Sequence, residues 1–236
     1  MNQVIPVVLL LASTGLFAAD APANLPTLSN DEKVAGWKLL FDGVNTTGWR
    51  GLGMEGVPAC WVVQDGCLKC VGGNKDTNDL VTMDTYQNFE FSFEWLIPKL
   101  KGNSGVKYRV QEQKGKGYAF GPEYQIMNDP DVANKNASGF LYDLFAPEGK
   151  KLAPEGKFNQ SRIVVQGNHV EHWLNGVKVV KAEFGSEAME AALAKSHFKN
   201  TDWGKKPEGH IALQNHHSEV LFRNLKIRLL PSEVKK

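Results

Sequence analysis

Three neighbouring stretches of the chain alternate between apolar and polar residues with a period of two. In residues 89–95 every second residue is aromatic, and residues 103–111 and 121–128 continue the alternation. This is the period of a β-strand that buries one side and presents the other to solvent. We expect three successive strands whose polar sides share one sheet face, and we expect a functional site there. The polar residues of that face are Glu90, Ser92, Glu94, Lys107, Arg109, Gln111, Glu123 and Gln125.

The rest of the chain carries further signals of an all-β fold. Turn dipeptides occur at short intervals, among them Asp65-Gly66 and Asn175-Gly176, both typical of two-residue hairpins. A capping serine and helical spacing of apolar residues coincide only at 186–198. With 236 residues and 42% hydrophobic content, one domain can bury a sizeable core. We predict an antiparallel two-sheet jelly-roll sandwich over residues 35–231, with one short helix near 186–198.

Residues 1–21 have the pattern of a secretory signal peptide, because a short apolar run at 4–12 is followed by small residues at 18–21. The run is too short to span a membrane, and no later stretch could cross a bilayer. We expect an exported protein, periplasmic or extracellular, with a tether at 22–34 and a polar tail at 232–236. The net charge of +1, from 27 basic and 26 acidic residues, indicates neither nucleic acid nor an anionic membrane as a partner.

An ordered set of short motifs runs through the predicted domain. In chain order they are residues 40–43 (Leu-Phe-Asp-Gly), 48–49 (Gly-Trp), 102–105 (Gly-Asn-Ser-Gly), 108–110 (Tyr-Arg-Val), 121–125 (Gly-Pro-Glu-Tyr-Gln), 172–176 (His-Trp-Leu-Asn-Gly), 209–214 (Gly-His-Ile-Ala-Leu-Gln) and 222–224 (Phe-Arg-Asn). From about Trp37 to Leu230 the chain resembles the 3-keto-disaccharide hydrolase family. The resemblance implies a concanavalin A-like jelly roll with a sugar-binding concave face, in exported bacterial proteins that act on 3-keto-glycosides.

The chemistry that this resemblance implies needs few groups. A ketone at C3 of a sugar acidifies the hydrogen on C2, so a base can remove it, and the resulting enolate can expel the C1 substituent. Water then adds back, and the net result is hydrolysis. Such a site needs a base within hydrogen-bond reach of C2 and donors, or a metal, to hold the enolate oxygen. Lyase, hydratase and net hydrolase all need these groups and stay open as outcomes.

The polar face predicted above contains both kinds of group. By alternation Glu123 is the candidate base, and Arg109, together with Lys107, is the candidate clamp for the enolate or a hydroxyl oxygen. The alternative is that Glu123 and Arg109 form an ordinary cross-strand ion pair on a solvated face. The resemblance favours the catalytic interpretation.

Other polar and aromatic residues are candidates for binding the small sugar substrate. They are the amides Asn103, Gln125 and Gln214, then His216, which by parity shares the side of Gln214, and Trp203 in a polar loop after the predicted helix. Trp203 could stack on a sugar ring or, alternatively, plug the rim of the cleft.

A divalent metal ion is chemically plausible but no ligand spacing demands it, and the sequence requires no cofactor. The candidate ligands are Glu94, Glu123 and His216, which offer oxygen and nitrogen donors. Glu94 could equally pair with Lys107 or Arg109 on the same sheet face.

Two other functions remain as alternatives to a 3-keto-glycoside hydrolase. A lectin-like carbohydrate-binding module can use the same fold without catalysis. A conventional endoglycanase would need two carboxylates close together, in a Glu-x-Asp-x-x-Glu type of arrangement. Glu123 is followed by no acid until Asp129, which makes the endoglycanase the weaker alternative.

Overall fold

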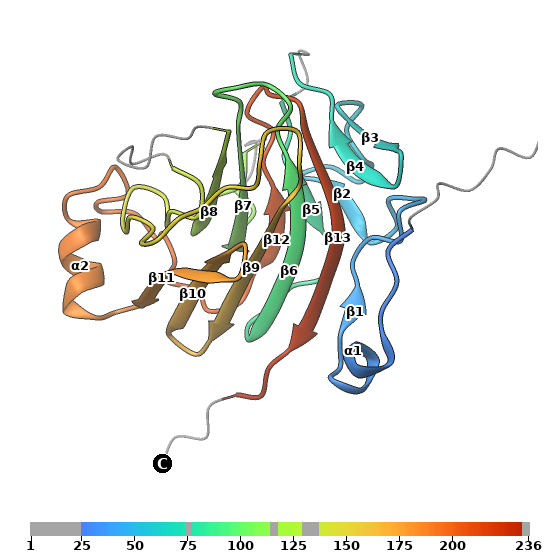
Figure 1. Ribbon diagram of the computed structural model, residues 1–236. Coiled ribbons are helices and arrows are strands. Elements are labelled where there is room, and N and C mark those ends of the chain that lie inside the picture. Colours follow the sequence, from blue (N-terminus) through green and yellow to red (C-terminus); the bar gives the residue numbers. More distant parts are fainter. Residues whose placement is uncertain (1–24, 74–76, 114–117, 129–136, 233–236) are drawn as a thin grey trace, which may run out of the picture.

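The computed structural model describes residues 25–73, 77–113, 118–128 and 137–232, and they form two antiparallel β-sheets packed face to face (Figure 1). The eight-stranded sheet has the order β11-β10-β9-β6-β13-β4-β3, with β1 also paired to β13; the five-stranded sheet has the order β2-β5-β12-β7-β8. The predicted all-β, two-sheet sandwich is therefore confirmed. The strands are β1 (Lys38–Leu39), β2 (Trp49–Gly51), β3 (Trp61–Gln64), β4 (Cys67–Cys70), β5 (Leu80–Thr82), β6 (Phe89–Leu96), β7 (Asn103–Val110), β8 (Glu123–Met127), β9 (Asn159–Gln166), β10 (His169–Leu174), β11 (Val177–Glu183), β12 (His210–Leu213) and β13 (Val220–Leu229).

The core lies between the two sheets and consists largely of aromatic side chains. From β6 it receives Phe89, Phe91, Phe93 and Trp95, each at most 1% exposed, as the alternation predicts. Phe93 meets Tyr124 of the smaller sheet edge to face, with ring centroids 5.5 Å apart. Aromatic pairs of this kind contribute about 1 kcal/mol beyond the burial of their area. The two sheets are thus held together by the inward side of β6 against that of β8.

A polar group is also built into the core and is fully hydrogen-bonded. His172 of β10 is completely buried, with Nε2 at 3.1 Å from the Tyr108 hydroxyl and Nδ1 at 3.0 Å from the Gly139 carbonyl oxygen. Burial lowers the pKa of His172 to about 4, so the ring is neutral at physiological pH. This residue serves the packing of the sandwich and lies outside the candidate site described below.

The prediction that three successive strands share one polar face is wrong for the first of them. β6 pairs with β9 and β13 in the larger sheet, whereas β7 and β8 pair with each other in the smaller one. The segment between β6 and β7 carries the chain across from one sheet to the other, and alternation within a strand contains no information about which strands become neighbours. The polar sides of β6 and β7 therefore point to opposite outer faces of the sandwich.

The described residues include two short helices at the periphery. In α2 (Glu187–Leu193) Ser186 caps the first turn by accepting a hydrogen bond from the backbone N–H of Met189, whose side chain is buried. The helix ends at Leu193, so it is shorter than the predicted 186–198. In α1 (Asn30–Val34) a capping box between Ser29 and Glu32 closes the first turn.

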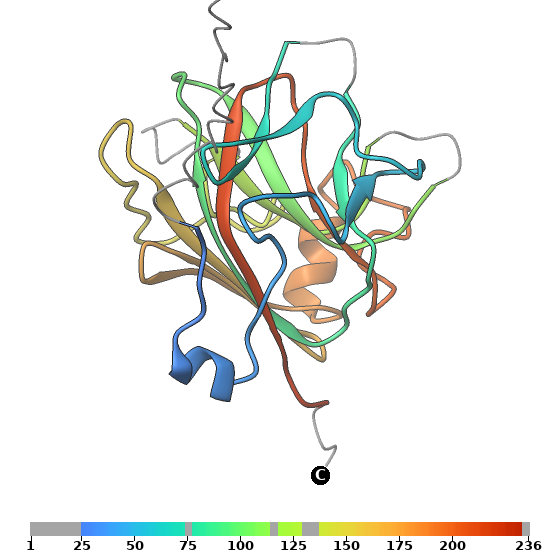
Figure 2. The same cartoon turned by 90° about the vertical axis from the view of Figure 1, so that its right-hand side faces the viewer.

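The N-terminal segment packs along the larger sheet. β1 pairs with β13, Glu32 of α1 forms an ion pair with Lys226 of β13, and the blue α1 segment lies beside the red β13 in Figure 2. The predicted signal peptide falls in residues 1–24, outside the described residues, and it stays a prediction together with the tether. No helix in the described part of the chain is both long and apolar enough to cross a membrane.

Candidate active site

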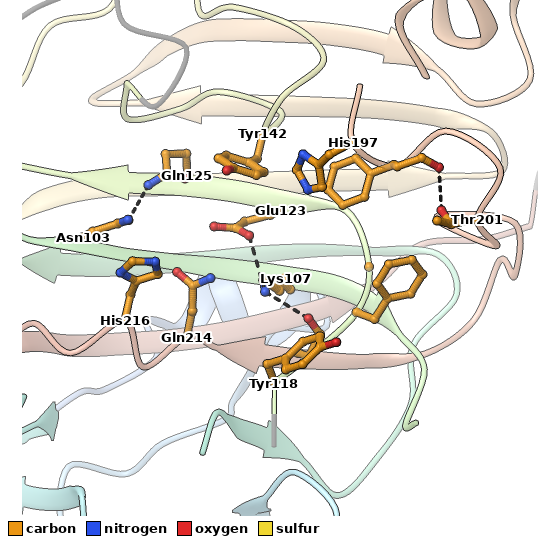
Figure 3. Close-up of a pocket in the computed structure, with 14 residues that line it drawn as sticks. Asn103, Lys107, Tyr118, Glu123, Gln125, Tyr142, His197, Thr201, Gln214 and His216 are labelled. Carbon is orange, nitrogen blue, oxygen red and sulfur yellow. Dashed lines mark hydrogen bonds and ion pairs between the residues drawn. The ribbon is translucent and has the colours of Figure 1, made fainter. Parts of the chain in front are cut away.

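A pocket of about 300 Å³ opens on the outer face of the smaller sheet, directly over β7 and β8. Its floor comes from the outward side chains of these strands, and its walls come from the ends of neighbouring loops. Figure 3 shows Glu123 between Lys107 and Tyr142, with Gln125 and His216 toward one end and His197 toward the other. The other residues that line the pocket are Asn103, Tyr118, Ala119, Phe120, Gly121, Phe198, Thr201 and Gln214.

Glu123 reaches the pocket because of the strand period and because of a glycine on the neighbouring strand. Tyr124 and Ile126 point into the core with no exposed surface, so Glu123 and Gln125 point outward. Gly105 of β7 lies opposite Gln125 in the strand pairing. A Cβ atom at Gly105 would clash with the Glu123 carboxylate. The missing side chain of this glycine therefore makes the space in which the carboxylate lies.

The Glu123 carboxylate is poorly solvated although it lies on an outer face. Its residue is 6% exposed, because the surrounding loops cover it. Burial raises the pKa of Glu123 to about 7; the Lys107 ammonium opposes this rise and the Asp79 carboxylate adds to it. A carboxylate with a pKa near neutrality is a stronger base than an ordinary one and is still ionised in a large fraction of molecules at pH 7. The geometry thus suits a general base.

Lys107 is the cation next to Glu123 and is itself held from the other side. Its Nζ lies 3.5 Å from Oε2 of Glu123 and donates a hydrogen bond to the Ala119 carbonyl oxygen at 2.9 Å. Both side chains are nearly buried, at 11% and 7% exposure. A positive charge fixed beside the base can stabilise negative charge that develops on a bound ligand.

Asp79 is a buried acid behind this pair that the sequence analysis did not identify. It is 1% exposed and accepts hydrogen bonds from the backbone N–H groups of Ala119, at 2.7 Å, and Asn215, at 2.9 Å. One carboxylate therefore ties together the loop that holds Lys107 and the segment after β12. Its sequence signal is weak: a single Asp at the start of an apolar strand.

A group of amides covers the end of the pocket opposite His197. The Gln125 Nε2 atom donates to Asn103 Oδ1 at 2.6 Å, and Gln214 contributes an Oε1 atom that is buried without a hydrogen-bond partner among the described residues. His216 lies exposed at the rim. The structure thus places Asn103, Gln125, Gln214 and His216 in one pocket with Glu123, and their binding of sugar hydroxyls stays a prediction.

Two predicted site residues, Arg109 and Trp203, lie outside this pocket. β7 carries one extra residue relative to β12 near Arg109, and Arg109 has the left-handed backbone angle φ +52°, so the alternation breaks at this point. Its guanidinium packs over Phe184 and donates to the Gly167 carbonyl oxygen instead of facing Glu123. Trp203 is 3% exposed and stacks on Phe198, so it offers no free ring face to a sugar in this pocket.

The predicted metal ligands do not come together either. Glu94 belongs to β6 of the larger sheet, where it accepts hydrogen bonds from Arg223 and Asn224, each at 2.8 Å. It is therefore on the other side of the sandwich from Glu123 and His216. Among the described residues, no group of three or more His, Cys, Asp or Glu side chains is arranged to hold a metal ion.

A histidine–aspartate pair at the pocket wall was missed by the sequence analysis. His197 Nδ1 lies 2.7 Å from Asp143 Oδ2, and the same oxygen accepts the backbone N–H of His197 at 2.9 Å. Tyr142 packs its ring against the imidazole, and its own N–H donates to the backbone oxygen of Glu123. With Nδ1 on Asp143, the Nε2 atom is the one available to a ligand. The partners are 54 residues apart, so no local pattern signals the pair.

Comparison with known proteins places this chain in a family. Residues 36–228 match the family model described as a 3-keto-α-glucoside-1,2-lyase-like domain. A protein of Bacteroides thetaiotaomicron named 3-keto-disaccharide hydrolase is 30% identical over 242 residues, covering 88% of this chain and 83% of that protein.

Solved structures agree with this match. A crystal structure of a Parabacteroides distasonis protein, provisionally assigned as a glycosyl hydrolase, is 33% identical with a TM-score of 0.77, covering 88% of this chain and all of that chain. A second protein from that organism, 24% identical with a TM-score of 0.60, shares the fold; the match covers 82% of this chain and 99% of that chain. The sequence motifs, the sandwich and these matches agree, and the chain belongs to the 3-keto-α-glucoside-1,2-lyase-like family.

Proposed function

We propose that this protein is a glycoside-cleaving enzyme that hydrolyses 3-keto-disaccharides and related 3-keto-glycosides through abstraction of the C2 proton. Family membership and the name of the Bacteroides relative support the substrate class. The observation that carries the mechanism is Glu123, a nearly buried carboxylate whose pKa burial raises to about 7, beside a lysine in a polar pocket.

In the proposed reaction Glu123 removes the hydrogen on C2 of the bound sugar, and the electron pair of that C–H bond forms an enolate with C3. Lys107, at 3.5 Å from the carboxylate, neutralises the negative charge that passes from Glu123 to the ligand. The enolate then re-forms the C3 ketone, makes a C1–C2 double bond and breaks the bond from C1 to the leaving oxygen. Addition of water across C1 and C2 returns the proton to C2 and completes net hydrolysis.

The departing alcohol needs a proton, and we propose His197 as the acid that supplies it. Asp143 holds Nδ1 of the imidazole at 2.7 Å, so Nε2 is directed to ligands rather than to the protein. General-acid assistance of this kind contributes about 100- to 10,000-fold. The same nitrogen can accept a proton from the water that adds in the second half of the reaction, since the two steps reverse one another chemically.

The pocket argues against a conventional glycosidase. A retaining enzyme needs two carboxylates about 5 Å apart, one as nucleophile and one as acid. Among the described residues that line the pocket, Glu123 is the carboxylate, and its nearest charged neighbour is Lys107. One base beside a cation fits proton abstraction better than it fits displacement at C1.

The test is to incubate the purified protein in D₂O with a 3-keto-glucoside and, separately, with its unoxidised parent, each with and without EDTA. NMR would follow sugar release and deuterium at C2. We expect release from the keto sugar alone, deuterium at C2 of the product, and loss of both in Glu123→Gln, while the matched control Glu148→Gln, exposed and outside the pocket, keeps them. Loss of sugar release in the presence of EDTA would indicate that the site needs a metal ion.

Two results would overturn the proposal. Turnover of the unoxidised parent would indicate ordinary glycosidase chemistry. Binding of both sugars without turnover, in folded protein, would indicate the lectin-like alternative. Export is proposed on the N-terminal sequence alone, and the check is cell fractionation with determination of the mature N-terminus, where we expect cleavage near residues 18–21.

A further inference from the structure

A second cavity, of about 510 Å³, lies behind the active-site pocket and shares the side chains of Phe198 and Thr201 with it. Arg109 of β7 forms one wall, and the turn after β11 together with α2 forms another. The lining is largely aromatic and aliphatic near the base, with Phe184, Met189 and Trp203 buried. This cavity is separate from the residues assigned above to catalysis.

Arg109 is buried in this cavity, and the described part of the chain offers it no acidic partner. The residue is 3% exposed; its guanidinium lies 4.1 Å above the Phe184 ring and one Nη atom donates to the Gly167 carbonyl oxygen. Among the described residues, its Nε has no hydrogen-bond partner and no carboxylate forms an ion pair with the guanidinium. Arginine remains charged at all relevant pH values, and a buried charge is stable only when something compensates it.

Another residue that lines the same cavity, Trp203, also has an unpartnered buried donor. The Nε1 atom of Trp203 is buried and also has no hydrogen-bond partner among the described residues. Buried N–H groups are nearly always satisfied in folded proteins. Two residues that each hold an unsatisfied buried donor, one of them cationic, therefore line one cavity with aromatic walls.

The mouth of the cavity carries positive charge, as Arg109 does inside it. Lys199 and Lys205 are exposed there, and Glu190 is the acid among the described lining residues. Lys205 is already paired with Asp202, at 2.8 Å, so Lys199 and Arg109 are the cations left to meet an incoming group.

We propose that this cavity binds a small ligand through an anionic oxygen group, a carboxylate, phosphate or sulfate. Arg109 anchors the anion, the Trp203 N–H donates to it, and Phe184 and Phe198 pack against the body of the ligand. A planar guanidinium is well suited to the oxygens of such groups. An acidic sugar and free inorganic phosphate share this chemistry, and the experiment separates them.

The experiment titrates the full chain with glucuronate, inorganic phosphate and, as the neutral control, glucose, at constant ionic strength. The readouts are the melting temperature and the indole N–H signal of Trp203 in a ¹H–¹⁵N NMR spectrum, assigned through Trp203→Phe. We expect the anions, but not glucose, to move this signal and to raise Tm by about 3 °C at roughly ten times Kd. Tighter binding of glucuronate would identify an acidic sugar; tighter binding of phosphate would identify the inorganic anion.

Variants decide whether Arg109 is responsible. Arg109→Gln is expected to raise the Kd for the anions by at least about tenfold. The matched control is Arg162→Gln, because Arg162 also lies 4.1 Å over an aromatic ring but already has Glu90 as a partner at 2.7 Å. Should Arg109→Gln fail to fold, Trp203→Phe tests the same cavity. This substitution removes the indole N–H but keeps an aromatic side chain, and it should weaken anion binding. Equal responses to glucose and glucuronate, no response to any anion, or anion binding unchanged in the Arg109 or Trp203 variant would each overturn the proposal.

Discussion

Replacing Glu123 by Gln should stabilise the folded protein at neutral and alkaline pH. The substitution keeps the size and shape of the side chain but removes its ionisation. Burial raises the pKa of Glu123 from 4.5 to about 7, so the folded state binds this proton more tightly than the unfolded state does. Stability therefore falls as pH rises from 4.5 through 7, and this loss is absent in the Gln variant.

The expected magnitude follows from the size of the shift. A displacement from 4.5 to about 7 corresponds to about 3 kcal/mol at about 1.4 kcal/mol for each unit of pKa. The favourable effect of Lys107 on the carboxylate is already included in this shift. Near pH 4 the Glu123 side chain is mostly neutral in both the folded and the unfolded state, and the stabilities of the two proteins should differ little. By pH 8.5 the variant should be more stable by up to about 3 kcal/mol.

Chemical denaturation at pH 4, 5.5, 7 and 8.5, followed by tryptophan fluorescence, measures the difference. The control is Glu171→Gln: burial acts against ionisation there, but hydrogen bonds from Lys178, His169 and Trp173 outweigh it and lower the pKa of Glu171 to about 2. The Glu171 carboxylate is ionised in both the folded and the unfolded state above about pH 5.5. The difference in stability between Glu171→Gln and the unaltered protein should therefore be constant above that pH.

A stability difference for Glu123→Gln that is constant from pH 4 to 8.5, or that turns against the variant as pH rises, would refute the reasoning about the buried carboxylate.

The ionisation of Glu123 also predicts how the activity of the unaltered enzyme depends on pH. For a 3-keto-glycoside with a nitrophenol leaving group, which needs little help from the acid His197, kcat/KM should rise about tenfold per pH unit below 7 and level off above it, since only the ionised base can remove the C2 proton.

Three further substitutions test the neighbours of the base. Gly105→Ala adds a Cβ that displaces the Glu123 carboxylate, so kcat/KM should fall by about 100-fold while circular dichroism stays unchanged. Asp79→Asn leaves one of two buried backbone N–H groups without an acceptor, which should cost about 1–3 kcal/mol in denaturation. It also removes a negative charge that raises the pKa of Glu123, so the midpoint of the pH–activity profile should move down. His197→Gln should slow poor leaving groups such as alkyl alcohols by about 100-fold and nitrophenol far less; equal slowing of both would exclude His197 as the acid.

Local patterns predicted the strands around the site closely. Alternation indicated residues 89–95 and 103–111, and the structure has β6 at Phe89–Leu96 and β7 at Asn103–Val110. It also indicated the side of β8 on which Glu123 lies. These properties depend on residues two positions apart in one strand, so they can be read before any tertiary contact forms.

Contacts between distant segments escaped the same reasoning. Glu94 lies on the other side of the sandwich because the chain crosses between sheets after β6, and Arg109 leaves the site because a single extra residue in β7 reverses the alternation. Asp143 and His197 meet across 54 residues, a separation that leaves no trace in spacing or composition.

The sequence by itself determined the family, the two-sheet class of fold and the presence of a carboxylate among bases and amides on one side of a strand. Only the tertiary structure decided what that carboxylate can do. The pKa of Glu123 depends on the loops that exclude water from it, on the distance to Lys107 and on the buried Asp79 behind them. Desolvation and interatomic distance are properties of the closed fold, and for this reason no pattern along the chain expresses them.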